Sequence, residues 1–375
     1  MRPLRHFIAL AGLAASAAFA APKVDVIATG LSNPRGIAFA PNGQLFVTEA
    51  GRGGAGACAV LGDGQTACYG ETGALTRIDV FGVEAPLQVI GGLPSLAPAG
   101  GFGAVGPHSI SFVGTGNGQL AIGLGAAAAV RQGLGAKSAM FGRTLQVNLA
   151  GAWKLGADVA AFETATNAVP GGIDSNPYGV LALPSRHVIA DAGANALFEV
   201  AANGAMRTLA TFGSRPVTAP PIPGLPPTID MQAVPTCVAQ GPDGFLYVGQ
   251  LTGFPFPVGG ANVYRVPPDG GAPQVFAQGF TNIVGLAFDA RGVLYVLQIG
   301  SGLAGPGGPP LQGPGRLIRV NANGQQTVVY DSLFYPGGLA IGPDGAAYVT
   351  NFGIVPGRIP QAFPDGGQVL RISLD

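Results

Sequence analysis

The sequence predicts an all-β protein: a six-bladed β-propeller with four antiparallel strands per blade, whose N-terminal strand closes the last blade. Three observations support this fold class. Among the 375 residues are 63 glycines and 33 prolines, a density that disfavours helices. Yet 47% of the residues are hydrophobic, so the chain can bury a core and is not disordered. A unit of β runs and tight turns recurs six times, and one β run is left over at the N-terminus.

Residues 1–20 have the features of a secretory signal peptide. Arg2 and Arg5 precede an apolar run that ends in Ala18-Phe19-Ala20, a small-x-small cleavage signal. The run is too short to span a bilayer as a mature helix. We therefore expect residues 21–375 to form a single propeller domain that is secreted or periplasmic.

The charge content limits the possible partners. The chain carries 19 Lys and Arg against 19 Asp and Glu, and only 10% of its residues are charged. No basic stripe is available to neutralise phosphates, so a nucleic-acid partner is not expected. No other apolar run is long enough for a transmembrane helix. A small molecule or another extracytoplasmic protein remains as the expected partner.

The repeat defines the blades. Each unit has two β runs joined by a tight turn such as Asn42-Gly43 or Asp243-Gly244, which are strong hairpin signals. Further β runs follow, for example at residues 73–80 and 272–280, so a unit has four strands and the chain has six units. The units open at Asn33, Gly106, Asn176, Val234, Asn282 and Tyr335.

The last unit has only three strands, while residues 23–31 form an unassigned β run before the first unit. We expect this run to pair with residues 367–375. Such pairing closes the ring and leaves no free strand edge that could recruit another chain.

The repeat also assigns loops to faces. The turns between the first and second strands are short and lie on one face, the short-turn face. Loops after the second and fourth strands lie on the opposite face, the long-loop face, and the sequence places its large insertions there. Because long loops in compact domains usually carry function, we expect a binding surface on this face. The insertion at residues 157–172 has no clear register; the others are residues 51–72, 93–106, 125–141, 212–234, 251–260, 299–314 and 352–366.

The three cysteines suit an oxidising compartment. Cys58 and Cys68 bracket nine residues in a glycine-rich stretch, and we expect them to form a disulfide. Cys237 stands where the other repeats have glycine or serine. We interpret it as a small buried residue and not as a nucleophile.

Aligned repeats bring polar residues to two equivalent positions at the expected channel mouth, where they could converge on a ligand. A competing interpretation is that the Glu and Asp side chains accept backbone N–H bonds at strand ends and that asparagines supply Asx-turns. The first position lies two residues after the opening residue of each unit, and the second is the last residue of the second β run. At the second position, unit two has the apolar Leu124 in place of a polar residue. The candidate ligand-binding residues are Arg35, Glu49, His108, Tyr178, Asp191, Gln250, Gln298 and Asn351.

Four segments resemble the ScyD/ScyE family, extracytoplasmic propeller proteins named for a scytonemin biosynthesis cluster. They are SNPRGIAFAPNGQLFVTEAGRGG, DSNPYG, MQAVPT and LTGFPFPVG, at residues 32–54, 174–179, 231–236 and 251–259. The resemblance spans nearly all of the mature chain. It implies the propeller fold and export, and no established reaction. A more distant similarity connects the repeat to NHL propellers, gluconolactonase-like hydrolases and soluble quinoprotein sugar dehydrogenases.

These similarities raise an alternative function: cation-dependent hydrolysis of a lactone or ester. Glu49 and Asp191 could bind Ca²⁺ through carboxylate oxygens, although the ligand order of gluconolactonase-like propellers is not reproduced. A quinoprotein dehydrogenase would need a histidine base and several arginines, and the expected ring has one of each. The sequence leaves open whether the protein is an enzyme.

Overall fold

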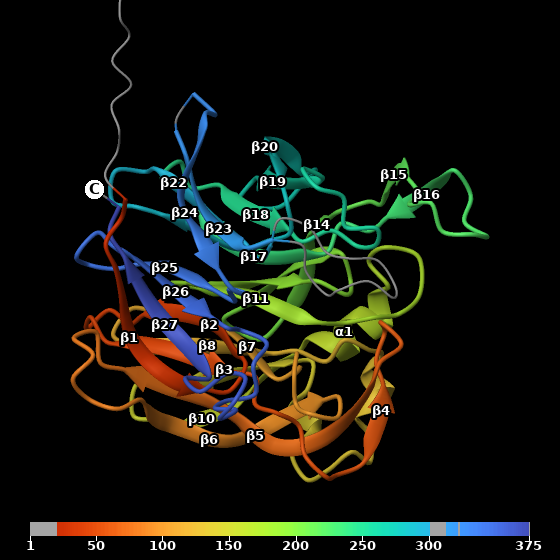
Figure 1. Cartoon of the computed structure of the whole chain (residues 1–375). Helices are drawn as coiled ribbons and strands as arrows, with labels where there is room; N and C mark the ends of the chain where they lie inside the picture. The colour runs from red at the N-terminus through yellow and green to blue at the C-terminus, as the bar shows by residue number, and fades with distance from the viewer. Residues whose placement is uncertain (1–20, 301–312, 322, 375) are drawn as a thin grey trace, which may run out of the picture.

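A computed structural model describes residues 21–300, 313–321 and 323–374. Among these residues, the strands form six antiparallel sheets arranged as the blades of a propeller, and one additional two-stranded hairpin (Figure 1). The predicted signal peptide at residues 1–20 lies outside the described residues. No described helix combines the length and apolar character needed to cross a membrane.

The first five blades each take their strands from consecutive parts of the chain, as the repeat predicts, and the sixth also takes β1 from the N-terminus. The first blade contains β2 (Pro34–Phe39), β3 (Leu45–Glu49), β5 (Thr66–Ile78), β6 (Leu87–Ala97) and the short β4 (Cys58–Val60). The second and third contain β7 (Pro107–Val113), β8 (Asn117–Ile122), β9 (Arg143–Val147) and β10 (Trp153–Asp158), then β11 (Pro177–Leu183), β12 (Arg186–Asp191), β13 (Ala196–Ala201) and β14 (Met206–Thr211).

The fourth and fifth blades contain β17 (Pro235–Gln240), β18 (Leu246–Gln250), β19 (Ala261–Val266) and β20 (Gln274–Phe280), then β21 (Ile283–Phe288), β22 (Leu294–Gln298), β23 (Gly315–Val320) and β24 (Gln326–Leu333). The sixth contains β25 (Leu339–Ile341), β26 (Ala347–Asn351), β27 (Gly367–Ile372) and β1 (Val24–Leu31).

The predicted closure of the ring is confirmed. Strand β1 pairs antiparallel with β27, with Val24 opposite Ile372 and Leu31 opposite Gly367. In Figure 1 the red N-terminal strand lies beside the blue C-terminal strand. The first and last strands of the chain therefore share one sheet.

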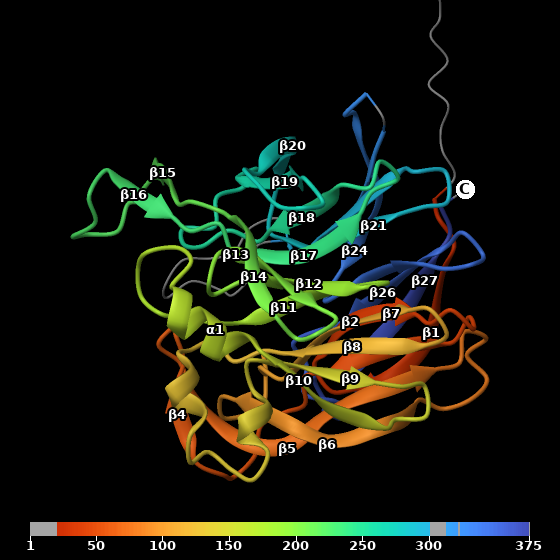
Figure 2. The same ribbon diagram turned by 180° about the vertical axis from the view of Figure 1, so that it is seen from behind.

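The described insertions lie on one face, and two of them differ from the sequence-based expectation. Residues 51–72 are not simply a loop, because β4 pairs with an extension of β5 that places Cys58 directly opposite Cys68. These two cysteines form the predicted disulfide. Residues 157–172 contain helix α1 (Val159–Thr166), which follows a fourth strand and therefore belongs to the long-loop face. In Figure 2, β4, α1 and the β15–β16 hairpin all lie on the left side.

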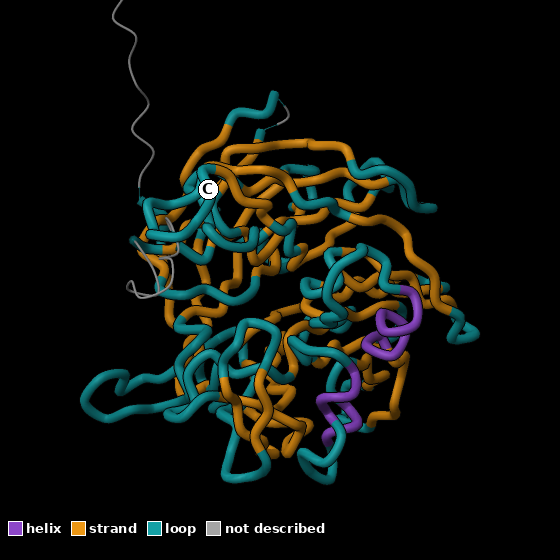
Figure 3. Tube along the Cα trace, turned by 90° about the vertical axis from the view of Figure 1, so that its right-hand side faces the viewer, coloured by secondary structure: helices purple, strands orange, loops and turns teal. Residues whose placement is uncertain are grey.

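Local capping explains where α1 begins and ends. The Asp158 side chain accepts the backbone N–H of Ala161 at 3.1 Å, and Asn167 ends the helix in the left-handed conformation. Figure 3 shows the helical segments in purple on one side of the molecule. The insertion at residues 125–141 contains two 3₁₀ turns, η1 (Ala128–Arg131) and η2 (Ser138–Met140). The two-stranded hairpin follows β14 and consists of β15 (Arg215–Thr218) and β16 (Thr228–Met231). Most of the insertion at residues 299–314 lies outside the described residues.

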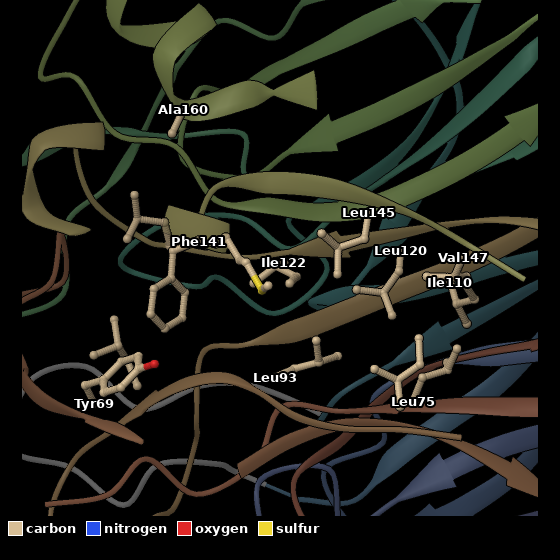
Figure 4. Close-up of a cluster of buried hydrophobic side chains, with 14 of the residues drawn as sticks. Tyr69, Leu75, Leu93, Ile110, Leu120, Ile122, Phe141, Leu145, Val147 and Ala160 are labelled. Carbon is tan, nitrogen blue, oxygen red and sulfur yellow. The ribbon is translucent and has the colours of Figure 1, made fainter. Parts of the chain in front are cut away.

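The core consists of apolar layers between neighbouring blades. Between the first two blades, Leu75, Leu120 and Leu145 are fully buried in one cluster (Figure 4). The aromatic rings of Phe46 and Phe112 lie 5.0 Å apart in the same layer. Since dispersion and burial act along each interface, every blade is stabilised mainly by its two neighbours.

Candidate functional site in the axial channel

A cavity of about 320 Å³ runs along the axis and is lined by residues of β2, β7, β11, β17, β21 and β25, the first strand of all six blades. Two residues in or next to each first strand, two positions apart, line the cavity, and all of them are small except Leu181. They form two layers: Gly36, Ser109, Gly179, Cys237, Gly285 and Gly338, followed by Ala38, Ser111, Leu181, Ala239, Ala287 and Ala340.

The channel is narrow because its walls approach closely. A Cβ on Gly36 would lie 2.7 Å from the Cα of Ser109 in the next blade, so only glycine fits there. The hydroxyls of Ser109 and Ser111 accept the backbone N–H groups of Val180 and Ala182 at 3.2 and 3.0 Å. Small side chains therefore both shape the channel and join neighbouring inner strands.

Exposure changes along the channel. At its long-loop end, Arg35, His108 and Thr236 are buried. Toward the short-turn face, Ala38 and Ala239 are partly exposed and Gln240 is exposed. The cavity is therefore more open to solvent on the short-turn side than at the mouth that the sequence predicts as the binding surface.

His108 and Tyr178 lie together at the long-loop end of the cavity. Their ring centroids are 4.6 Å apart and the planes are tilted by 39°. Burial, and then the nearby charge of Arg35, lower the pKa of His108 to about 3, so the imidazole is neutral at physiological pH. A Cβ on Gly123 would lie 2.3 Å from the imidazole Cε1, so the glycine makes room for this ring.

Other members of this ring join neighbouring blades. The Thr236 hydroxyl donates to the carbonyl of Ile283 at 2.7 Å. The Arg35 guanidinium donates to the carbonyl of Ala104 at 2.9 Å. Of Arg35, His108 and Tyr178, the three predicted site residues at this position, Tyr178 alone is partly exposed.

The two carboxylates proposed as cation ligands are buried inside separate blades. Glu49 accepts the backbone N–H of Ser32 at 2.7 Å and the hydroxyl of Thr76. Asp191 accepts four hydrogen bonds, from the Ser175 hydroxyl and from the backbone N–H groups of Asn176, Gly193 and Ala194. Burial raises the pKa of Glu49, against the hydrogen bonds from Thr76 and Ser32, and raises the pKa of Asp191 to about 6.

The three predicted amides have the same structural role. Gln298 and Asn351 accept the backbone N–H groups of Thr281 and Phe334 at 3.0 and 2.7 Å. Gln250 accepts from Asn262 at 3.1 Å. None of the five strand-end residues is part of the cavity lining. The competing interpretation of Glu49 and Asp191 as backbone acceptors at strand ends describes their geometry, and the three amides make bonds of the same kind. In blade two the strand ends at Ile122 and not at Leu124.

A shared cation site is not formed. Glu49 and Asp191 have no common partner, and within the described ranges no three His, Cys, Asp or Glu side chains come close enough to hold a metal ion. The residues predicted to bind Ca²⁺ therefore do not fit such an ion, and we derive no chemistry through one.

Two of the three asparagines that open repeats have a conformational role, and Asn176 does not adopt the same backbone conformation. Asn33 and Asn282 have φ angles of 49° and 52°, in the left-handed region that asparagine tolerates better than most residues. Their side-chain amides donate to the carbonyls of Gly51 and Leu251, both at 2.6 Å. Val234 adopts the same conformation with φ of 54°.

The sequence predicts that Cys237 is small, buried and unreactive, but this residue is only partly buried. It forms part of the channel wall and is partly exposed. Burial raises the pKa of its thiol to about 12, so the reactive thiolate is scarce at neutral pH.

No family model and no curated protein matches this chain. Solved structures with a similar fold include a structural genomics protein of unknown function from Bacteroides thetaiotaomicron (TM-score 0.54, 10% identity, covering 94% of this chain and 76% of that chain). An auxiliary nutrient binding protein from the same organism gives a TM-score of 0.52 at 8% identity, with coverage of 94% and 76%. A luciferin-regenerating enzyme gives 0.51 at 10% identity, with coverage of 94% and 95%. At these identities the likeness shows the fold alone.

Proposed function

We propose that this protein binds a small molecule in its axial channel. The observation that carries the proposal is the cavity of about 320 Å³, to which all six blades contribute small side chains. Small-molecule sites in proteins occupy roughly 300–1,000 Å³, so the cavity is large enough for a compact ligand. This proposal keeps the binding role expected from the sequence and moves the site away from the strand-end residues.

The channel offers hydrogen bonds without a formal charge at its surface. Its polar groups include the Ser109 and Ser111 hydroxyls, the Tyr178 phenol, the Gln240 amide at the short-turn end and the backbone edges of the inner strands. His108 is neutral, and Arg35 is buried beyond the cavity lining. A neutral or weakly polar ligand that reaches Tyr178 from the short-turn side fits this environment.

A substitution in the channel lining tests the proposal. Thermal-shift screening of a metabolite library would be followed by native mass spectrometry of the ligands found. The variant Ala239→Leu enlarges a residue that lines the channel, and Ala85→Leu makes the same change at an exposed position outside it. We expect ligands that stabilise the wild type to bind Ala85→Leu equally and Ala239→Leu at least tenfold more weakly. Equal binding to both variants would disprove the channel site.

Membership of the ScyD/ScyE family and export by residues 1–20 remain part of this proposal and rest on the sequence. The alternative, a cation-dependent hydrolase, gains no support from the positions of Glu49 and Asp191, because both carboxylates are occupied by donors within their own blades.

A further inference from the structure

The interface between the second and third blades differs in its core from the other blade interfaces. In each blade, one residue of the second strand faces the following blade and the residue before it faces the preceding blade, because side chains alternate along a strand. At four interfaces these two positions meet inside one apolar cluster. The pairs are Val188 with Leu246, Tyr247 with Leu294, Tyr295 with Ala347, and Tyr348 with Leu45.

Between the second and third blades the equivalent residues are Gln119 and His187. Strand pairing sets the equivalence: Gln119 lies opposite Ser111, as Tyr247 lies opposite Ala239. His187 immediately precedes Val188, as Leu246 precedes Tyr247. Two polar side chains thus stand where the other interfaces bury tyrosine, valine, leucine or alanine.

The polar pair lines a groove of about 670 Å³, twice the volume of the axial cavity. His187 is only 7% exposed. Its Nε2 atom and the Oε1 atom of Gln119 are buried and have no hydrogen-bond partner among the described residues. A buried polar atom without a partner costs about 1–3 kcal/mol, so most such atoms in proteins are paired with protein, water or a ligand.

The fold itself does not require this cost, because apolar residues occupy the same positions at four other interfaces of the same molecule. A local choice that conflicts with the surrounding architecture is expected mainly at functional sites. The pair therefore indicates a ligand that completes the hydrogen bonds of Gln119 and His187.

The chemistry of the groove is largely neutral. Burial lowers the pKa of His187 to about 4, so its imidazole is uncharged at neutral pH. Charged residues in the groove lining have partners: Asp158 pairs with Arg131 and Arg143, and Arg186 pairs with Glu199. The remaining polar lining consists of amides and a hydroxyl, from Asn117, Gln146, Ser185 and Asn203.

Neutral groups that both donate and accept match hydroxyl groups, which do the same. We propose that the groove between the second and third blades binds a small neutral polyhydroxylated molecule, such as a disaccharide, through Gln119 and His187. This site is separate from the proposed channel site and goes beyond it.

Histidine NMR gives a direct readout, since the chain has only three histidines. Protein labelled with ¹³C-histidine would be titrated with maltose, cellobiose and trehalose, and with citrate as a charged comparison. The Cε1–H signal of His187 is assigned by its loss in His187→Leu. We expect at least one disaccharide to shift the His187 signal saturably, while the His108 signal in the channel ring stays unchanged and citrate has no effect.

Variants separate binding from folding. His187→Leu restores the residue type found at three equivalent positions, so we expect the free energy of unfolding to be equal or higher and disaccharide binding, measured by calorimetry, to weaken at least tenfold. Gln119→Leu should weaken binding similarly. Ala239→Leu, which enlarges a residue of the axial channel lining, should leave disaccharide binding unchanged.

Three results would overturn the inference. The first is no saturable shift with any of the three disaccharides, which would mean that water alone fills the groove. The second is binding of citrate in their place. The third is unchanged disaccharide affinity in both His187→Leu and Gln119→Leu.

Discussion

The carboxylate of Asp191 accepts the backbone N–H of Asn176 at 2.6 Å, and so ties the end of β12 to the start of its own blade. Glu49, Gln298 and Asn351 make a similar bond in three other blades, to the residue just before the one that opens the repeat. From the aligned repeats alone, these side chains are expected at the channel mouth. They satisfy buried backbone donors where a blade begins, which explains why polar residues recur there.

The pH dependence of stability should reveal the buried carboxyl of Asp191. Its pKa is about 6 in the folded chain, above the ordinary value of 3.8, so the unfolded chain loses this proton first as the pH rises. The stabilisation that this raised pKa adds to the free energy of unfolding is fully present below about pH 4. It falls between about pH 4 and 6, by up to roughly 3 kcal/mol. Urea unfolding of wild type and Asp191→Asn across this range measures the difference in slope.

The asparagine variant is a close match, because its remaining oxygen can accept the three backbone N–H bonds that Oδ1 now accepts. Asp191→Ala removes all of them and should lower the free energy of unfolding by about 2–4 kcal/mol below pH 4, and by less above pH 6, where the wild type has lost the stabilisation from the raised pKa. A parallel slope in wild type and Asp191→Asn would contradict the assignment of the pH dependence to this residue. Added Ca²⁺ should change none of these curves.

The left-handed backbone conformation at Val234 should be strained, and a substitution should relieve this strain. A β-branched residue at φ of 54° is unfavourable, whereas Asn33 and Asn282 adopt the same conformation readily. We expect Val234→Asn to raise the free energy of unfolding by about 1 kcal/mol and Asn282→Val to lower it by a larger amount. Chemical denaturation of both variants checks this. A loss of stability in Val234→Asn would show that the valine side chain contributes more packing than strain.

The strand that closes the ring should be essential. Strand β1 buries Leu31 and most of Ile27 against the first and last blades, and pairs with the outer edge of β27. Deleting residues 23–29 should expose that edge and cause aggregation, detected by light scattering. Leu31→Ala should cost about 2–5 kcal/mol by leaving a cavity. Removing only residues 21–22 serves as the control, and cooperative unfolding of a soluble 23–29 deletion would refute the role of this strand.

The cysteines should differ sharply in reactivity. Cys58 and Cys68 are joined, so mass spectrometry without reduction should find them linked. Burial raises the pKa of Cys237 to about 12, so iodoacetamide should leave it unmodified in the folded protein at pH 7 and modify it after unfolding in urea. Rapid labelling of the folded protein would mean that the channel leaves the thiol accessible and ionised.

Much of the fold could be predicted because its signals are local and repeated. The Asn42-Gly43 and Asp243-Gly244 turns define hairpins from a few adjacent residues, and six copies of one unit determine the number of blades. An unassigned strand at one end and a missing strand at the other then leave one economical closure. The pairing of Cys58 with Cys68 was predictable for a similar reason, because the two lie close in sequence.

The candidate sites depend on side-chain orientations, which the spacing of residues in the sequence does not reveal. The repeat locates Glu49 and Asp191 at strand ends, but only packing decides whether a side chain there turns toward the axis or toward its own backbone, and burial favours the backbone donors. In the same way, the sequence contains Gln119 and His187 without showing that they line one groove. These two residues are 68 positions apart in the sequence. Their common groove between the second and third blades follows from the alternation of side chains on two strands, and the positions of these strands are defined only once the ring of blades has closed.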